Sequence, residues 1–584
     1  MGYYQSNLRL LKEKEPLLVR RLDKVSTLKD IHIFKEKVVP KDIDLDKTDV
    51  IVVLGFGLGD LIKELIKRTD EDILILVIEP SMPMFKSALA LRDLSEILKS
   101  KKVSLAIGET PISATLGRLN EYSENLEGIF ELWIVENGTF FNPAKSYYLE
   151  AKRYLKEAFS IMSHHVVTVR RLHITWKRNV LRNLEAMVIH PGVDRLFNKF
   201  LKKPALIVSA GPSLDKNIKD ISLAKDRSLV ICVDTALRSL LGQGIRPDLV
   251  VSVDASCENY TYYLKGIDVD GLILITNPIV YPDIITKFGE RVFISDMERP
   301  IVKFLGGFIG FKGYIDKAAG SVSQYAFNLA RHFGCDPIIL VGLDLAYPDG
   351  RFYAEGIPKE RIKKAQEIEF KDKVWVEDIY GGRVPTSHLF YTFLLWFNAK
   401  IKETCNLTTY IDATEGGAKI EGTRIMTLKE AIKEFCRSKI WIKRILFDAL
   451  SYYKPPSTEG LIRGLDELID EYKTVKFLSE EGKRKVDSIL SKKTYGLEEI
   501  DQSLQRLDGI TQRIIEKENF SSFNQFNVQS LLYEMKRNLR RIKKGKDIFF
   551  DLAKEYKTFF EEIQKLCDGI ALDLEDARDR LSRS

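Results

Sequence analysis

The sequence lacks paired cysteines, long apolar runs and a large excess of either charge. Its cysteines are scattered without a CxxC pair, which argues against a disulfide framework or a zinc site and predicts reduced thiols; they are Cys232, Cys257, Cys335, Cys405, Cys436 and Cys567. No apolar run reaches the roughly 18 residues that suggest a membrane helix. The N-terminal stretch has charges within its apolar part, unlike a signal peptide. We therefore expect a cytoplasmic protein without a membrane span.

The small charge imbalance argues against one class of partner. The 584 residues include 90 Lys and Arg against 83 Asp and Glu, which gives a net charge of +7. Basic residues are spread among acidic ones, so dedicated nucleic-acid binding is disfavoured, whereas an anionic small ligand is compatible with this charge. A chain of this length with 45% hydrophobic residues should hold about three domains.

Alternating strand and helix patterns predict two α/β domains. In the first, the apolar runs typical of buried parallel strands are Val50–Leu54, Ile73–Ile78, Val103–Ile107 and Phe130–Val135. In the second they are Ala205–Ser209, Leu229–Val233, Leu249–Val253, Leu272–Thr276, Val292–Ile294 and Pro337–Val341. Helical patterns fall between these runs, so each domain is expected to be a doubly wound parallel sheet of the nucleotide-binding type.

The other segments have helical patterns. From Thr427 onward glycine and proline become sparse and apolar residues recur at helical spacing, which predicts an all-helical region. We therefore expect four parts: an N-terminal α/β domain at 1–143, a helical connector at 144–203, a central α/β domain at 204–426 and a helical C-terminal domain at 427–584.

A glycine-rich turn follows the first predicted strand. Gly55, Gly57 and Gly59 lead into a helix, and Glu79 ends the next strand. This is the layout of a nucleotide or S-adenosylmethionine site, in which glycines shape the turn and a carboxylate binds the ribose hydroxyls. Such turns also occur without a ligand, so a structural turn in a vestigial nucleotide fold is the alternative.

The most informative motif is the turn after Ala205–Val208, within the segment ALIVSAGPSLDKNI. Gly211 allows close approach of the backbone, Pro212 stiffens the turn, and Ser213 can cap the helix that follows. A strand–turn–helix of this kind presents backbone N–H groups and the positive end of a helix, so it predicts a phosphate site. An ordinary βα turn is the alternative.

Polar residues also end several other predicted elements of the central domain. Asp234, Asp254 and Asp344 would lie at the carboxyl ends of strands, where doubly wound folds bind their ligands. For each acid, a helix cap or a loop contact is the alternative. Gly320 and Ser321 precede a helix and form a second helix N-terminus suited to an anion.

Two tyrosines and one histidine complete the candidates. Tyr347 and Tyr353 lie on a loop rich in Pro and Gly after the last predicted strand, where their hydroxyls can hydrogen-bond a phosphate unless they are packed on the surface. His388 is the late histidine near the expected active edge and competes with Asp254 and Asp344 as the general base, whereas Asp234 is expected to help bind the ligand. A packed or solvated histidine is the alternative.

The central motifs together resemble the motility-associated factor family of flagellin glycosyltransferases, usually called Maf. The motifs run in the order GPSL, GIRPD before a VSVD strand, GSV before a helix, VGLDLAY, and the turn EGGA at 415–418. The flanking domains resemble that family too. Its central domain is similar to bacterial sialyltransferases that use CMP-activated sugars, which share the Gly-Pro-Ser turn and tyrosines that bind the leaving phosphate. Archaeal pterin pyrophosphokinases share the central domain but are far shorter.

This resemblance implies an inverting transferase. It would move a nonulosonic acid, of the pseudaminic or legionaminic type, from its CMP conjugate to Ser or Thr hydroxyls of flagellin, with a flagellin export chaperone as a further candidate partner. No cofactor is implied, because CMP leaves with one phosphate that helix ends and hydroxyls can stabilise. Asp268-Val269-Asp270 matches a metal-binding DxD pattern but lies in a solvated turn, so we expect no metal site.

Three other functions stay open. Pyrophosphoryl transfer from ATP to a pterin would use the same central domain and would need Mg²⁺. A flagellin-binding chaperone with vestigial nucleotide folds would need no chemistry at all. A methyltransferase built on the first glycine turn has the least support. The sequence leaves the identity of the sugar, the acceptor residues and the oligomeric state open.

Overall fold

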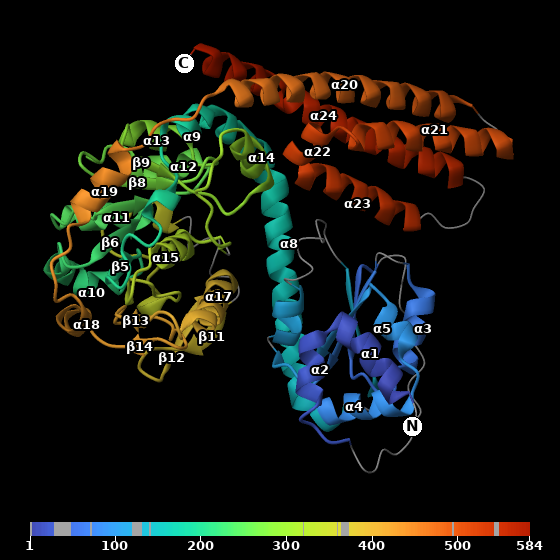
Figure 1. Ribbon diagram of the computed structural model, residues 1–584, viewed down its shortest axis with the longest axis horizontal. Coiled ribbons are helices and arrows are strands. Elements are labelled where there is room, and N and C mark those ends of the chain that lie inside the picture. The colour runs from blue at the N-terminus through green and yellow to red at the C-terminus, as the bar shows by residue number, and fades with distance from the viewer. Residues whose placement is uncertain are drawn as a thin grey trace. The chain divides into compact units, whose positions relative to one another are not determined.

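The computed structural model describes residues 3–27, 48–70, 73–111, 113–119, 131–138, 142–318, 320–358, 360–363, 373–492, 496–541 and 548–583 (Figure 1). The chain divides into two compact units. The first holds Met1–Arg171, Glu481–Thr511 and Phe526–Glu562, and the second holds Leu172–Glu480, Gln512–Gln525 and Ile563–Ser584. Because the C-terminal helices contribute residues to both units, these units do not follow chain order, and the four-part division expected from the sequence stays a prediction.

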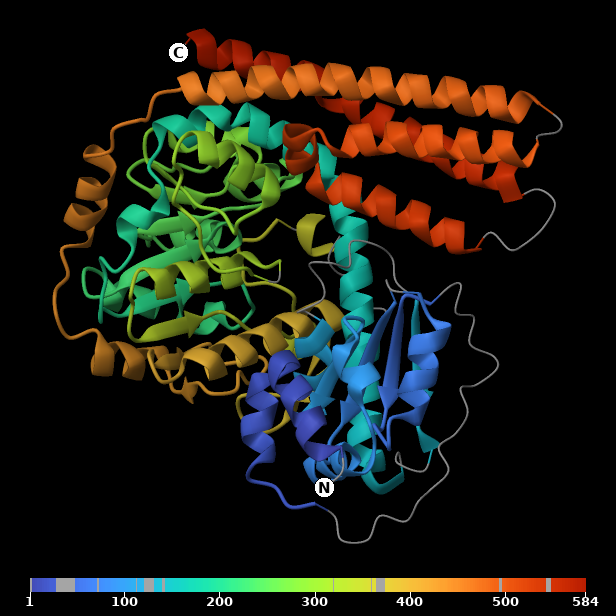
Figure 2. The same cartoon turned by 45° about the vertical axis from the view of Figure 1, so that its right-hand side comes forward.

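The first unit is built on a parallel sheet of four strands in the order β3-β2-β1-β4, coloured blue in Figure 2. The strands are β1 (Val50–Leu54), β2 (Leu74–Glu79), β3 (Val103–Ile107) and β4 (Leu132–Glu136). They agree with the predicted strands to within about two residues at each end. Phe130, with which the fourth strand was predicted to begin, lies outside the described residues.

Helices cover both faces of this sheet. Ile51 and Val53 of β1 pack against one group of helices, which comprises α1 (Tyr4–Lys14), α2 (Pro16–Leu22), α3 (Asp60–Arg68), α4 (Met82–Leu91) and α5 (Ser95–Lys99). Val50 and Val52 pack on the other face with Tyr148 of α8 (Lys145–Arg182). Successive residues of a strand point to opposite faces, so burial on both faces requires the uninterrupted apolar runs of the sequence.

The second unit is built on a parallel sheet of eight strands in the order β14-β13-β10-β5-β6-β7-β8-β9. The strands are β5 (Ala205–Val208), β6 (Leu229–Val233), β7 (Leu249–Val251), β8 (Ile273–Thr276), β9 (Val292–Ile294), β10 (Ile338–Val341), β13 (Tyr410–Asp412) and β14 (Arg424–Ile425). The chain adds strands outward from β5 to β9 and then places β10, β13 and β14 on the other side of β5. The strand order therefore reverses between β5 and β10, which is the topological switch point.

The described helices of this part of the chain are α9 (Leu184–Ile189), α10 (Leu214–Asn217), α11 (Asp234–Gly242), α12 (Cys257–Asn259), α13 (Pro282–Phe288), α14 (Pro300–Phe308), α15 (Val322–His332) and α17 (His388–Thr404). Helix α15 packs across β10, β5, β6 and β7. An antiparallel hairpin, β11 (Lys373–Glu377) and β12 (Arg383–Ser387), leads into α17. This hairpin and the strands β13 and β14 were not predicted from the sequence.

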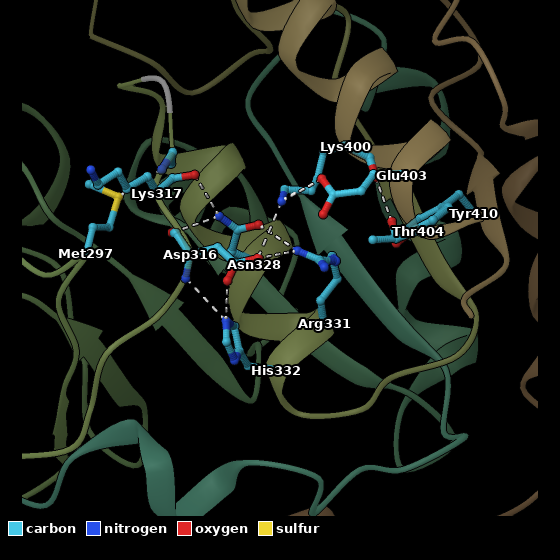
Figure 3. A network of polar contacts seen from close by, with 11 residues as sticks. Met297, Asp316, Lys317, Asn328, Arg331, His332, Lys400, Glu403, Thr404 and Tyr410 are labelled. Atoms are coloured by element: carbon cyan, nitrogen blue, oxygen red, sulfur yellow. Dashed lines mark hydrogen bonds and ion pairs between the residues drawn. The ribbon is translucent and has the colours of Figure 1, made fainter. Parts of the chain in front are cut away.

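Helix α15 is fixed along its C-terminal half by Asp316 (Figure 3). The Asp316 carboxylate accepts a hydrogen bond from Arg331 (2.8 Å) and pairs with Lys400 of α17 (3.6 Å). The Asp316 N–H donates to Nε2 of His332 (3.2 Å), and Nδ2 of Asn328 donates to the Asp316 carbonyl oxygen (3.0 Å). These contacts bind the segment before α15 to two helices and so fix the direction in which α15 crosses the sheet.

The C-terminal region is mostly helical. It comprises α18 (Leu428–Phe435), α19 (Ile442–Ser451), α20 (Glu459–Ser491), α21 (Leu497–Ile515), α22 (Glu518–Phe523), α23 (Gln525–Arg541) and α24 (Ile548–Arg583). Two parallel sheets with their helices, followed by this region, confirm the predicted fold class. Within the described ranges, no helix combines the length and the apolar character needed to cross a membrane.

Candidate active site

Polar side chains stand at the carboxyl ends of the central strands. Ser209 directly follows β5, Asp234 directly follows β6, and Asp412 is the last residue of β13. Asp344 lies shortly beyond β10, which ends at Val341. Ligands of open parallel sheets bind outside the carboxyl ends of the strands where the strand order reverses. The junction of β5 and β10 is therefore the candidate active site.

Asp344 stands at the centre of this junction and is only 2% exposed. Its Oδ2 accepts hydrogen bonds from the N–H (3.2 Å) and the Oγ (2.7 Å) of Ser213. Its carbonyl oxygen accepts a hydrogen bond from the N–H of Ala418 (2.7 Å). Its Oδ1 is buried and has no hydrogen-bond partner among the described residues. Three segments of the chain thus meet at this buried residue.

Two glycines pack so closely against Asp344 that a side chain would not fit at either position. A Cβ on Gly211 would lie 2.0 Å from Oδ2 of Asp344 and 2.6 Å from the carbonyl oxygen of Gly342. A Cβ on Gly417, whose φ is +80°, would lie 2.3 Å from the Asp344 carbonyl oxygen. Side chains at these positions would push the Asp344 loop away from its neighbours, so both glycines are required by packing.

The Gly-Pro-Ser turn uses its N–H groups within the fold. The N–H of Gly211 donates to the carbonyl oxygen of Gly342 (2.8 Å), the N–H of Ser213 donates to Asp344, and Pro212 has no N–H. Helix α10 has only four residues, so its dipole is small. In this structure the turn holds Asp344, and phosphate binding by Gly211, Pro212 and Ser213 stays a prediction.

A second buried carboxyl group, Asp412, lies at the neighbouring strand end and was missed from the sequence. Its Oδ1 accepts a hydrogen bond from the N–H of Thr414 (3.1 Å), and its Oδ2 has no partner among the described residues. Burial raises the pKa of Asp412 to about 6. Burial likewise raises the pKa of Asp344 to about 6, against the opposing effects of Ser213 and Lys216, and the charge of Asp412 adds to the increase.

The other two predicted acids have different surroundings. Asp234 is fully buried, and its carboxylate accepts hydrogen bonds from Oγ of Ser252 (2.7 Å) and Nδ2 of Asn259 (2.8 Å). Burial raises the pKa of Asp234 to about 6 although these bonds oppose the shift. Asp254 is exposed, and its Oδ1 accepts a hydrogen bond from the N–H of Ser256 (2.7 Å). Asp254 follows β7, which β6 separates from β5, so it does not belong to the β5–β10 junction.

His388 is the exposed first residue of α17. The strand before it, β12, contacts the loop that carries Asp344. Oγ1 of Thr386 donates to the carbonyl oxygen of Leu345 (2.7 Å), and the N–H of Tyr347 donates to the carbonyl oxygen of Pro385 (2.8 Å). The fold therefore brings the His388 segment to the Asp344 loop, although the two lie far apart in the sequence.

Helix α15 brings the second predicted anion site to the same edge. Oγ of Ser321 accepts a hydrogen bond from the N–H of Ser323 (3.2 Å) and caps the helix. Oγ of Ser323 is hydrogen-bonded to Oγ of Ser209 (2.8 Å), which links the first turn of α15 to the end of β5. Gly320 is exposed with φ +102°, and no heavy atom lies within 4 Å of the position that its Cβ would take.

The predicted tyrosines differ in burial. Tyr347 is 2% exposed, and its ring packs on Phe352 (4.4 Å between centroids) and Phe390 (5.3 Å). Tyr353 is half-buried at the margin of this aromatic cluster, and the Arg361 guanidinium lies 5.7 Å from the centre of its ring. Tyr347 is thus part of a small core, whereas Tyr353 lies closer to the surface.

The loop that carries Tyr353 is attached to the Gly-Pro-Ser turn. The N–H of Ala354 donates to the carbonyl oxygen of Ala210 (2.9 Å). The carboxylate of Asp215 accepts a hydrogen bond from the N–H of Glu355 (2.8 Å) and forms an ion pair with Arg351. These contacts place Tyr353 beside the β5–β10 junction, and sequence reasoning missed the role of Asp215 in them.

In the first unit, the carboxylate of Glu79 is hydrogen-bonded to the glycine turn. Gly55, Gly57 and Gly59 all have positive φ, as the predicted turn requires. Glu79 is 3% exposed, and its carboxylate accepts hydrogen bonds from the N–H of Phe56 (3.1 Å) and of Ser81 (2.8 Å). Glu79, which was expected to bind a ribose, instead accepts hydrogen bonds from the backbone of its own fold. Ligand binding at these four residues stays a prediction.

The buried carboxyl group of Glu79 should make the stability of this unit depend on pH. Burial raises the pKa of Glu79 to about 7, so the folded state favours its neutral form. The stability that this provides is present at low pH and is lost as the pH rises from about 4.5 to about 7, on the order of 3 kcal/mol. Hydrogen exchange of β1 and β2, corrected for intrinsic rates, should show protection falling over this range.

The Glu79→Gln variant provides the comparison. Its uncharged amide should remove most of the pH dependence, whereas Asp60→Asn, at an exposed residue, should leave it unchanged. Equal pH dependence in Glu79→Gln and the wild type would contradict the assignment to Glu79.

The residues of the DxD pattern are engaged in ion pairs. Asp268 pairs with Arg246 (3.2 Å) and Asp270 pairs with Arg291 (3.3 Å), all at the surface. Both acids are thus neutralised by arginine side chains.

Comparison with known proteins bears on this site. The family model described as 6-hydroxymethylpterin diphosphokinase MptE-like matches residues 178–350, which include Gly211 and Asp344 but not His388. An uncharacterized protein of Treponema pallidum (strain Nichols) is 27% identical over 179 residues, which are 30% of this chain and 80% of that protein. The structure of the MAf glycosyltransferase from Magnetospirillum magneticum AMB-1 matches with a TM-score of 0.58 and 15% identity, over 99% of this chain and 97% of that one.

The chain has the MAf glycosyltransferase fold. The resemblance seen in the sequence motifs is therefore confirmed as a likeness of fold, and it extends over both sheets and the helical C-terminal region. At 15% identity this likeness concerns the fold alone. The functional assignment therefore depends on the chemistry of the β5–β10 junction.

Proposed function

We propose that this chain is a glycosyltransferase that moves a nonulosonic acid, of the pseudaminic or legionaminic type, from its CMP-activated form to Ser or Thr hydroxyls of flagellin. The main support is the likeness of fold to a MAf glycosyltransferase over nearly the whole chain. The order of the central motifs supports the same assignment. In this proposal flagellin is the acceptor, a flagellin export chaperone is a further partner, and the reaction takes place in the cytoplasm.

The proposed reaction is an inverting displacement. The bond between the sugar and the CMP phosphate breaks with its electron pair on the phosphate oxygen, while the acceptor oxygen bonds to the opposite face of the sugar. A general base takes the proton of the acceptor hydroxyl. A leaving group with a single phosphate can be stabilised by helix ends and hydroxyl donors, so no metal or other cofactor is required in this proposal.

Asp344 is the proposed base. It lies at the switch point, its Oδ1 has no partner among the described residues, and a pKa of about 6 suits a base that works near neutral pH. His388 is the second candidate, because its segment contacts the Asp344 loop through β12. Asp254 has the weakest support of the three, because it follows β7 and not β5 or β10.

Tyr353 is proposed to stabilise the departing phosphate. Charge builds on that phosphate as the bond breaks, so a hydroxyl donor contributes more in the transition state than in the ground state. Tyr353→Phe should lower single-turnover transfer roughly 10²-fold and change the affinity for CMP much less. Tyr347→Phe keeps the packed ring and tests the second predicted hydroxyl. Wild-type rates in the folded double variant would show that neither hydroxyl takes part.

Pyrophosphoryl transfer from ATP to a pterin is the alternative. The match of residues 178–350 to the pterin diphosphokinase-like model favours it specifically. This chemistry needs a divalent cation to neutralise the phosphates, whereas the proposed CMP-sugar transfer does not.

Ligand-dependent thermal stability distinguishes the two functions. We expect CMP to raise the unfolding temperature of the full chain without Mg²⁺, with no further increase when Mg²⁺ is added. ATP should have little effect in either condition. Stabilisation by ATP with Mg²⁺ and not by CMP would contradict the proposed donor and favour the pterin kinase reaction.

A further inference from the structure

The strongest unexplained feature of the second unit is the side-chain amide of Gln324. This residue is fully buried in the first turn of α15. Its Oε1 accepts a hydrogen bond from the N–H of Ser321 (3.2 Å), as in a capping box. Because a backbone N–H donates to this atom, it must be the amide oxygen, and the NH₂ group occupies the other position. That Nε2 has no hydrogen-bond partner among the described residues.

An unpaired amide donor in this position calls for an acceptor. Leaving a buried NH₂ group without a partner is costly, and native folds retain such groups chiefly where a ligand or an ordered water completes them. The capping-box bond holds the amide against the N-terminus of α15, a helix of 11 residues whose dipole favours negative charge there. The unpaired amide requires an acceptor, and the helix dipole favours an anion in that role.

The position of this helix end agrees with that conclusion. Oγ of Ser323 is hydrogen-bonded to Oγ of Ser209, the residue that follows β5, so the first turn of α15 lies at the switch point. Exposed Gly320 borders open space immediately before the cap. The Gly-Pro-Ser turn, by contrast, directs the N–H groups of Gly211 and Ser213 into the fold.

We propose that Gln324 donates a hydrogen bond from Nε2 to a phosphate oxygen bound at the start of α15. In this proposal the N-terminus of α15 is the principal phosphate site of the eight-stranded sheet. The inference rests on the proposed function only in taking CMP as the source of that phosphate. Because the amide is screened from bulk water, its hydrogen bond is stronger than one made at the surface.

Gln324→Glu tests this and keeps an acceptor for the helix cap, although burial of its carboxylate is expected to lower stability. A glutamate is the usual residue at this position of a capping box, and the chain has such a box at α18, where Oε2 of Glu430 accepts from the N–H of Thr427 (3.0 Å). The substitution keeps an oxygen for Ser321 and replaces the donor by a negative charge. At pH 8 we expect the Kd for CMP and for inorganic phosphate, measured by calorimetry on the full chain, to rise at least about 30-fold.

Two further variants complete the test. Gln324→Met removes the donor without adding charge, so the Kd should rise by about tenfold, and it covers the case in which the glutamate variant fails to fold. Glu430→Gln makes the reverse exchange in the second capping box and should leave both affinities unchanged.

The outcomes separate this inference from the proposed function. If folded Gln324→Glu and Gln324→Met bind CMP as the wild type does, the inference is wrong and the proposed donor stands. If phosphate binding depends on Gln324 but CMP does not bind the wild type, the helix-end site stands and the proposed donor is wrong. Absence of both phosphate and CMP binding by the wild type would overturn the inference as well.

Discussion

The Asp344→Asn variant should lose glycosyl transfer and become more stable than the wild type above pH 6. Loss of a general base typically lowers the rate by 10²–10⁴-fold, and we expect a decrease in this range. The gain in stability has the same origin as the raised pKa. Burial disfavours the charged carboxylate, so the folded wild type holds a proton that the unfolded chain releases.

The pH dependence follows from that difference. The contribution of Asp344 to stability is fully present below its ordinary pKa near 3.8 and is lost as the pH rises to about 6. The advantage of Asp344→Asn should therefore grow between pH 4 and pH 6 and then stay constant, at about 1–3 kcal/mol. Thermal unfolding of both proteins across this range, together with single-turnover transfer at pH 7.5, measures the two effects.

Asp412→Asn is the matched control for Asp344. Both carboxyl groups are buried to a similar degree and both have a pKa raised to about 6. Asp412→Asn should therefore show the same gain in stability but a much smaller loss of transfer. Near wild-type transfer by folded Asp344→Asn would exclude Asp344 as the base and leave His388 and Asp254 as the candidates.

Gly211→Ala should destabilise the second unit strongly, by about 3 kcal/mol or more. Its Cβ would lie 2.0 Å from the buried carboxylate of Asp344 and 2.6 Å from the carbonyl oxygen of Gly342, so neither neighbour can move without breaking the contacts of the junction. Limited proteolysis and thermal unfolding should show that the second unit opens more easily.

Gly242→Ala is the control for this substitution. Gly242 lies at the end of α11, and no heavy atom lies within 4 Å of its Cβ position, so alanine should be neutral or stabilise the helix by up to about 1 kcal/mol. Adding Asp344→Ala to Gly211→Ala should recover part of the lost stability, because the closest overlap disappears. A Gly211→Ala protein as stable as the wild type would contradict the geometry of the junction.

The fold was predictable where strands are buried on both faces. Such strands require uninterrupted apolar runs, and Val50–Leu54 and Leu229–Val233 were predicted with their observed bounds. Strands β13 and β14 are too short for any run to stand out, with three and two residues. In the hairpin β11–β12, strand β11 is mostly exposed and carries charged residues, and β12 begins with Arg383 and contains Pro385, so no apolar run stands out.

The site was predictable in position but not in orientation. Asp344 was identified because an acid follows a buried strand, and Glu79 for the same reason. The direction in which each carboxylate points depends on partners distant in sequence: Ser213 for Asp344, and the N–H of Phe56 for Glu79. Asp412 and Gln324 were missed because only the packed structure shows that they are buried with an unpartnered atom.

The most direct test of the proposed function is mass spectrometry of flagellin from cells that make the wild-type protein, the Asp344→Asn variant or no protein. The account predicts that flagellin from wild-type cells carries a nonulosonic acid on Ser or Thr residues, and that this mass is absent from the other two. Flagellin with the same modification in all three strains would contradict the proposed transfer reaction.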